Sequence, residues 1–299
     1  MLIEARAYDA EGGDFDEQFD ALLKRIYLAR GITQQSALER QLSCLPSPSS
    51  MRGIDSAVAI LVDALVEQKR LLIVGDFDAD GATSSALMVL ALTAMGFKNV
   101  DFLVPNRFDY GYGLTPEIVD LALEREPQLL ITVDNGISSI DGVDKANKLG
   151  MQVIVTDHHL PGAALPAAAA IVNPNQPGCQ FVSKNLAGVG VAFYLLSALR
   201  AQLRDNKWFT ENTIAEPSMA TWLDLVALGT VADVVPLDQI NRALVHQGLM
   251  RIRAGRCRPG IKALLTIAGK NPQRLVATDL GFALGPRLNA AGRLDDISL

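Results

Sequence analysis

Short apolar runs alternate with helical patterns through the middle of the chain. The runs are rich in β-branched residues and fall at Leu71–Val74, Val100–Val104, Leu129–Val133, Val153–Val155 and Ala170–Val172. The segments between them, such as residues 82–95 and 139–149, space their apolar residues as a helix does. Alternating strands and helices predict βαβ units, so we expect an α/β fold with a parallel sheet flanked by helices.

The two ends of the chain depart from this alternation. Residues 19–28 have helical spacing, and Pro46–Ser50 is a breaker typical of a linker. Beyond Leu186 helical patterns dominate, at residues 189–203, 219–230 and 239–253. We therefore expect a small helical N-terminal segment over residues 1–50 and one domain over residues 51–299, whose C-terminal part is helical.

Composition and charge narrow the class of protein. Hydrophobic residues make up 49% of the 299 residues and charged residues 20%, which favours a large core over disorder. No apolar run is long enough to span a bilayer, and the first residues lack a signal-peptide core, so we expect a cytoplasmic protein with no membrane partner. Three distant cysteines indicate reduced thiols. The net charge of −6 argues against nucleic-acid binding by a global positive field but leaves a local basic groove open.

Acidic and imidazole side chains follow three of the expected strands. Asp76, Asp78 and Asp80 come after the first strand, Asp134 follows the third, and Asp157–His159 follows the fourth. Ligands of open parallel sheets bind beyond the carboxyl ends of the strands, so these groups are expected to meet at one edge. Carboxylates with imidazole suit Mn²⁺, with Mg²⁺ as the competitor. Two such ions can share a carboxylate, activate water and clamp a phosphoryl group in transfer.

These residues also allow two other interpretations. The motif Asp-x-Asp-x-Asp-Gly begins a calcium-binding EF-hand loop, but counting from Asp76 places Leu87 where that loop needs a glutamate. A lone histidine is usually structural, and we expect this of His246. The adjacent pair His158 and His159 after an aspartate is different, because the chain has only three histidines.

Three further segments carry candidate chemistry. Asp233 ends an apolar helical pattern, where it could be a metal ligand or a helix cap. Residues 285–293 place arginines and an asparagine among small residues, which suits phosphate binding. Residues 105–113 could contact a phosphate and stack a base, or only turn a loop. The basic residues between Arg251 and Lys262 could equally be a solvated helix face.

These motifs, in this order, resemble the DHH phosphoesterase superfamily. The resemblance lies in Asp76–Gly81, Val133–Gly136, Thr156–His159 and Ala232–Asp233. Longer strings at residues 104–113, 186–192 and 285–293 are similar to the RecJ-type exonucleases of that superfamily, and the match runs from about Gly53 to the end.

The resemblance implies a 5′→3′ single-stranded-DNA exonuclease that uses two Mn²⁺ or Mg²⁺ ions in DNA recombination and repair. Single-strand-binding protein and a RecQ-type helicase are the partners it implies. The implied metal ligands are Asp76, Asp78, Asp80, Asp134, His158 and Asp233, with Asp134 bridging. His159, Asp157 and Asp134 would be catalytic: His159 would be a metal ligand or a donor to the scissile phosphate, and Asp157 would orient a neighbouring side chain. The implied DNA-binding residues are Arg107, Tyr112, Arg287, Asn289 and Arg293.

Two other functions remain as alternatives. The first is a pyrophosphatase or oligonucleotide phosphatase of the same family, and the second is a non-catalytic relative that only binds single strands. The family also carries a DHHA1 domain and, in RecJ-type members, an oligonucleotide-binding fold, and neither is found in this sequence. We therefore expect the chain alone to bind metal but to degrade single strands poorly.

Overall fold

The computed structural model describes residues 7–9, 12–105 and 110–294. Its core is a sheet of parallel strands in the order β2-β1-β3-β4-β5. The strands are β1 (Leu71–Gly75), β2 (Val100–Leu103), β3 (Leu129–Val133), β4 (Gln152–Thr156) and β5 (Ala170–Val172). All five apolar runs form strands at the predicted places, which confirms the expected α/β fold.

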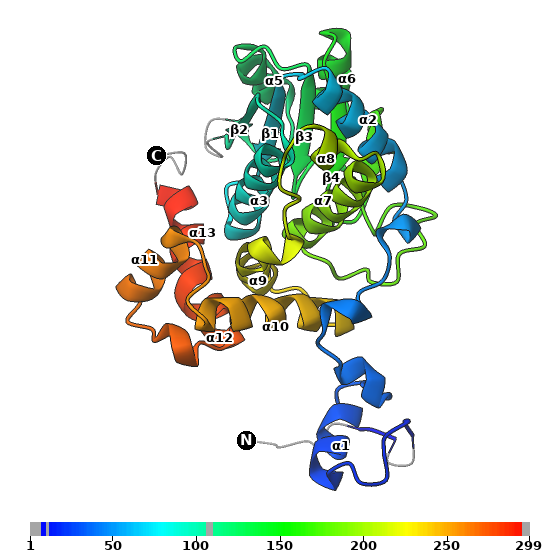
Figure 1. The fold of residues 1–299 in the computed structure, drawn as a ribbon, viewed down its shortest axis with the longest axis vertical. Coiled ribbons are helices and arrows are strands. Elements are labelled where there is room, and N and C mark those ends of the chain that lie inside the picture. The colour runs from blue at the N-terminus through cyan, green and yellow to red at the C-terminus, as the bar shows by residue number, and fades with distance from the viewer. Residues whose placement is uncertain (1–6, 10–11, 106–109, 295–299) are drawn as a thin grey trace.

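Helices cover both faces of the sheet because the central strands are apolar on both sides. Side chains of β1 alternate between two cores, with Ile73 in one and Leu72 in the other. The first core is closed by α2 (Ile54–Val66), α3 (Ala79–Met95) and α7 (Gly188–Asp205), and the second by α5 (Pro116–Leu123) and α6 (Ile140–Lys148) (Figure 1).

The register of the sheet brings the ends of its three inner strands level. Gly75 at the end of β1 pairs with Val133 at the end of β3, and Val133 pairs with Thr156 at the end of β4. The strand order also reverses between β1 and β3, which is where open α/β sheets form their ligand sites. The residues that follow these strands therefore share one edge.

A second, helical layer lies against this edge. It comprises α9 (Leu223–Ala232), α10 (Gln239–Arg253), α11 (Pro259–Ile267), α12 (Ala277–Asp279), a π-helix (Leu280–Leu284) and α13 (Gly285–Leu294), with short 3₁₀ turns at Met219–Trp222 and Pro272–Arg274 (Figure 1). The short helix α8 (Trp208–Glu211) lies at the far end of α3, where Trp208 donates to the carbonyl of Met95 at 2.9 Å. Buried residues of α9 belong to the same core as α3 and α7. The layer continues to α13, which returns to the start of α3.

The N-terminal segment is helical only in part. Helix α1 (Ala21–Leu28) forms as expected, and 3₁₀ turns follow at Gln35–Leu38, Leu42–Cys44 and Pro48–Ser50. The breaker at residues 46–50 thus forms a turn, in which Ser47 caps the amide of Ser49 at 3.3 Å. Side chains of α10 hold the preceding segment, since Arg242 donates to the carbonyl of Ala37 at 2.8 Å.

Two expectations from composition concern the cysteines and the membrane. The three cysteines are free thiols in the structure. Within the described ranges, no helix combines the length and the apolar character needed to cross a membrane.

Candidate metal centre

The loop after β1 carries three aspartates into the start of α3. Asp78 is the N-cap of α3, and its Oδ1 accepts from the amides of Asp80 and Gly81, each at 2.9 Å. This is the ordinary role of an N-cap aspartate, which satisfies amides that the helix leaves free. Asp76 precedes them and is 8% exposed. The cap turns the loop so that its carboxylates remain at the strand edge.

Asp80 is held by a second helix. Its two carboxylate oxygens accept from the first amides of α7, at 2.6 Å from Gly188 and 3.0 Å from Val189. A carboxylate is favourable there because the N-terminus of a helix carries partial positive charge. Asp80 is 1% exposed, so this contact joins α3 to α7 beneath the site.

Asp134 occupies the turn after β3 in a left-handed backbone conformation, with φ of 61°. Aspartate tolerates this conformation better than most residues with a side chain. The next residue, Asn135, anchors the turn by donating to the carbonyls of Val74 and Val133 at 3.1 and 2.9 Å. The turn thereby places a carboxylate that is 2% exposed between the ends of β1 and β4.

The two histidines after β4 have different electrostatic settings. Burial, together with the charge of His159, lowers the pKa of His158 to about 4, so this imidazole is neutral at pH 7 and able to bind a metal. His159 Nδ1 lies 2.7 Å from Asp157 Oδ1, and this hydrogen bond raises the pKa of His159. Burial alone would raise the pKa of Asp157, but its hydrogen bonds with His159 and with the amide of Ile137 hold it below the usual value. One imidazole is thus suited to a metal and its neighbour to carrying a proton.

Asp233 comes to the site from the helical layer. It is the C-cap of α9, where the partial negative charge of the helix end makes a carboxylate unfavourable. Burial and the nearby Asp78 raise its pKa to about 7. The helix-cap interpretation accounts poorly for an aspartate at this end, whereas a bound cation would offset both penalties.

The side chains of Asp134, His158 and Asp233 face one another, but their facing atoms lack hydrogen-bond partners among the described residues. His158 Nε2 lies 3.1 Å from Asp134 Oδ1 and 3.5 Å from Asp233 Oδ2. All three atoms are buried, and none makes a hydrogen bond to a described residue. Three overlapping sets have ligand atoms within 4.8 Å of one another: Asp76, Asp78 and Asp134; Asp80, His158 and Asp233; and Asp134, His158 and His159. Asp134 belongs to two sets, so the donors fit a pair of divalent ions that share a carboxylate.

The crowded carboxylates predict how stability depends on pH without metal. Burial and mutual repulsion raise the pKa values of Asp80 and Asp134, and that of Asp233 is about 7. Asp233 therefore keeps part of its proton above pH 6.5 in the folded chain, where the unfolded chain has lost it, and the raised pKa values of Asp80 and Asp134 act in the same direction, so the free energy of unfolding falls as pH rises. His159, with its raised pKa, acts in the same direction. We expect a fall of about 1 kcal/mol per pH unit for each such proton between pH 6.5 and 8, measured by urea unfolding in EDTA.

Metal should reverse that trend. Saturating Mg²⁺ stabilises the deprotonated carboxylates, so the same measurement with Mg²⁺ should show stability that rises or stays level over this interval. A metal-free protein whose stability is flat or rising from pH 6.5 to 8 would contradict the crowding of these groups.

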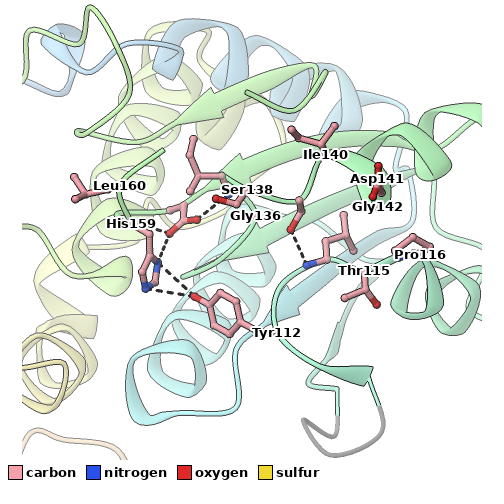
Figure 2. Close-up of a pocket in the computed structure, with 14 residues that line it drawn as sticks. Tyr112, Thr115, Pro116, Gly136, Ser138, Ile140, Asp141, Gly142, His159 and Leu160 are labelled. Atoms are coloured by element: carbon pink, nitrogen blue, oxygen red, sulfur yellow. Dashed lines mark hydrogen bonds and ion pairs between the residues drawn. The ribbon is translucent and has the colours of Figure 1, made fainter. Parts of the chain in front are cut away.

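The other predicted site residues lie around this cluster. The hydroxyl of Tyr112 donates to the carbonyl of Asp134 at 3.2 Å. The same hydroxyl lies 3.3 Å from His159 Nε2 (Figure 2). Arg287 is exposed on α13 and donates back to the carbonyl of Ala283 at 2.5 Å. Arg107 and the side chain of Arg293 lie outside the described residues.

His246 lies on α10 and belongs to none of the three candidate metal sets. The Asp76–Gly81 loop follows a strand, as the rejection of an EF-hand requires.

Asn289 contacts the aspartate loop through its side-chain oxygen. Its Oδ1 accepts from the amide of Ala79 at 2.8 Å, next to the cap Asp78, and fixes α13 against the loop. A DNA-contacting role would need the amide group as a donor, whereas this contact needs only an acceptor. We expect Asn289→Ala to weaken Mn²⁺ binding about tenfold, as loss of a ligand-orienting contact does, and Asn289→Asp to retain it. Calorimetric titration of both variants checks this, and equal loss in the two would contradict a positioning role.

Several residues that position the candidate metal ligands were not identified from the sequence. Asn173 and Asn175, directly after β5, donate to the carbonyls of His159 and His158 at 2.9 and 2.6 Å and fix the histidine pair. Their position after a strand end was the available signal. Gly188 and Gly229 leave room for carboxylates, because a Cβ would lie 2.6 Å from Asp134 Cβ at the first and 2.7 Å from Asp80 Oδ1 at the second.

Comparison with known proteins agrees with this geometry. The family model described as "DHH family, N-terminal domain" matches residues 70–230. The chain is 60% identical, over 97% of its length, to the single-stranded-DNA-specific exonuclease RecJ of Escherichia coli, and it spans 50% of that relative. A crystal structure of exonuclease RecJ bound to manganese matches with a TM-score of 0.72 and 37% identity, over 85% of this chain and 60% of that one. RecJ of Thermus thermophilus in complex with Mn²⁺ also matches with a TM-score of 0.72, at 35% identity, over 91% of this chain and 37% of that one.

Proposed function

The chain belongs to the DHH family, and from this premise we propose that it forms the catalytic part of a metal-dependent 5′→3′ single-stranded-DNA exonuclease of recombination and repair. The observation that carries the proposal is the meeting of Asp134, His158 and Asp233, whose facing ligand atoms are buried and without hydrogen bonds to described residues. Relatives of the same name as the E. coli protein support the choice of substrate, and the Mn²⁺ and Mg²⁺ complexes of RecJ support the choice of ion.

The cluster would hold two Mn²⁺ or Mg²⁺ ions, and Asp134 belongs to two of the candidate ligand sets. The remaining ligands would be Asp76, Asp78, Asp80, His158 and Asp233. When bound, such ions supply an activated water and neutralise charge on the phosphoryl group. The neutral state of His158 suits this assignment, because an imidazolium cannot bind a cation.

The chain's own residues would complete the chemistry at the scissile phosphate. The hydrogen bond with Asp157 orients His159 and raises its pKa, which favours the protonated imidazole that could donate to a phosphate oxygen as its charge grows. The hydroxyl of Tyr112 lies beside His159 and limits where its ring can move. This division explains why two adjacent histidines are useful: the first binds metal and the second carries the proton.

Recognition of the strand and of partners completes the proposal. Arg107, Arg287 and Arg293 would hold the DNA backbone by bidentate contacts, with Asn289 and Tyr112 nearer the reacting phosphate. A DNA substrate agrees with a cytoplasmic protein. Single-strand-binding protein and a RecQ-type helicase are the partners that would supply such strands.

The test is an assay of single strands labelled at the 5′ or the 3′ end, run with Mn²⁺ beside pyrophosphate and a dinucleotide. Early release of mononucleotide from the 5′ label supports the proposal. Release from the 3′ label only, or turnover of pyrophosphate alone, would replace it with another phosphoesterase activity. Strand binding with no turnover of any substrate would make the chain a binding protein. Raising the salt from about 50 to about 200 mM should weaken strand binding more steeply the more phosphates the chain holds, so a shallow salt dependence would indicate few phosphate contacts.

A further inference from the structure

A hollow of about 850 Å³ lies beside the carboxylate cluster and shares only one edge with it. Its walls come from the loop at Tyr112–Pro116, the turn and first residues of α6 at 136–142, and the segment after β4 that ends at Leu160 (Figure 2). We call it the side hollow. His159 and Asp157 form the shared edge, so the side hollow opens where the proposed mechanism places the scissile phosphate.

The lining of the side hollow suits a neutral, flat group. Leu114, Ile137, Ile140 and Leu160 supply apolar surface, and Ile140 and Leu160 keep 38% and 79% of their surface exposed. Such exposure next to a polar catalytic edge leaves apolar area that a ligand can cover. The rings of Tyr112 and His159 stand edge to face at a centroid distance of 5.9 Å and form one wall.

Charge argues against a second phosphate in this place. The acidic groups that line the side hollow are Asp141 and Asp157, and within the described part of the chain no lysine or arginine lines it. The proposed imidazolium of His159 is paired with Asp157 and would face the scissile phosphate, so a second phosphate in the hollow would meet Asp141 without a cation of its own, and juxtaposed like charges disfavour binding. A nucleobase is neutral and gains from aromatic and apolar contact.

We propose that the side hollow receives the base of the nucleotide attached to the scissile phosphate. The proposal rests on the proposed function and deepens it, because it makes a nucleoside, and not a second phosphate, the group recognised beside the reaction centre. With the phosphate at His159, the attached nucleoside would lie at the edge that the side hollow shares with the cluster. The site would then prefer nucleotides over pyrophosphate by apolar contact and by charge.

The test compares ligands that differ only in the base. The probe is 2-aminopurine deoxynucleoside 5′-monophosphate, whose fluorescence is quenched by stacking, titrated with Mg²⁺. 2-Deoxyribose 5-phosphate and inorganic phosphate are then used as competitors. We expect the nucleotide to bind the wild-type chain at least about tenfold more tightly than the sugar phosphate. Equal affinities would overturn the proposal for the hollow. Failure of all three ligands to bind in a metal-dependent manner would count against the proposed function itself.

A matched pair of variants locates the site. Ile140 is the first residue of α6, where an aspartate suits the helix end, so Ile140→Asp should fold while placing charge in the hollow. Leu22→Asp makes the same change in the first turn of α1, at an exposed position far from the hollow (Figure 1). Ile140→Asp should lose the preference for the nucleotide and keep its affinity for the sugar phosphate, and Leu22→Asp should keep both. If Ile140→Asp still prefers the nucleotide over the sugar phosphate, the proposal is overturned. If that variant does not fold, the affinities of the wild-type chain for the two ligands still test the proposal.

Discussion

Asp134→Asn should reduce Mn²⁺-dependent nucleotide release on the order of a thousandfold, because it removes the charge from the carboxylate that two metal sets share. The amide keeps the shape of the side chain, and asparagine tolerates the left-handed backbone with φ of 61° that the turn requires. Alanine at this position should abolish release too, but it would also strain the turn. Asp134→Asn therefore tests the role of the carboxylate charge without disturbing the backbone turn.

The same variant should be more stable than the wild type in the absence of metal. Asp134 is buried and repelled by Asp80 and Asp78, which raise its pKa, so removing its charge relieves the folded state at neutral pH. We expect a higher melting temperature for Asp134→Asn in EDTA at pH 8 and a smaller increase on adding Mn²⁺. Asp63→Asn, on α2 and away from the cluster, is the control and should change neither quantity. Full activity in Asp134→Asn would refute the shared-ligand assignment, and a lower melting temperature in EDTA would contradict the repulsion.

The position of the site was predictable because strand ends can be recognised in a sequence. Buried parallel strands consist of continuous apolar residues, so the first polar residue after each run marks its carboxyl end. Asp76, Asp134 and Asp157 all followed such runs, and the parallel register brings those three ends level. Asp233 lies at the end of a helix, and its place in the cluster came from family resemblance because nothing in a helical pattern shows what its end faces.

The parts that were not predicted depend on contacts between distant segments. Amides at the start of α7 bind Asp80, which is 108 residues away in the sequence from Gly188. Asn289 meets the amide of Ala79 across 210 residues. An apolar pattern does not specify which helix N-terminus will receive a given carboxylate. The small residues at 285–293 suggested a phosphate-binding string, and the structure forms them into a helix that packs on the aspartate loop.

The close approach of α7 to the cluster leads to the second large effect that we expect. A Cβ on Gly188 would lie 2.6 Å from Asp134 Cβ and 2.7 Å from its Oδ1, and such contacts must be relieved by movement. The backbone of Asp134 is fixed by its turn, so the carboxylate would have to rotate out of the shared position. Gly188→Ala should therefore lower activity about a hundredfold, the cost typical of displacing a reacting group by about 1 Å. Mn²⁺ affinity should fall about tenfold or more, because the ligand is misplaced.

Gly190→Ala is the matched control, because it makes the same change two residues along α7. Its Cβ would lie 3.1 Å from a terminal carbon of Leu186, which can rotate away, so activity should stay near that of the wild type. Alanine in place of glycine should favour the helix by about 1 kcal/mol, so neither variant should lose α7. Circular dichroism, Mn²⁺ calorimetry and nucleotide release measured on both variants separate these effects. If Gly188→Ala and Gly190→Ala bind Mn²⁺ with equal affinity, the start of α7 does not set the position of Asp134. The start of α7 would then support the site through its hydrogen bonds to Asp80 alone.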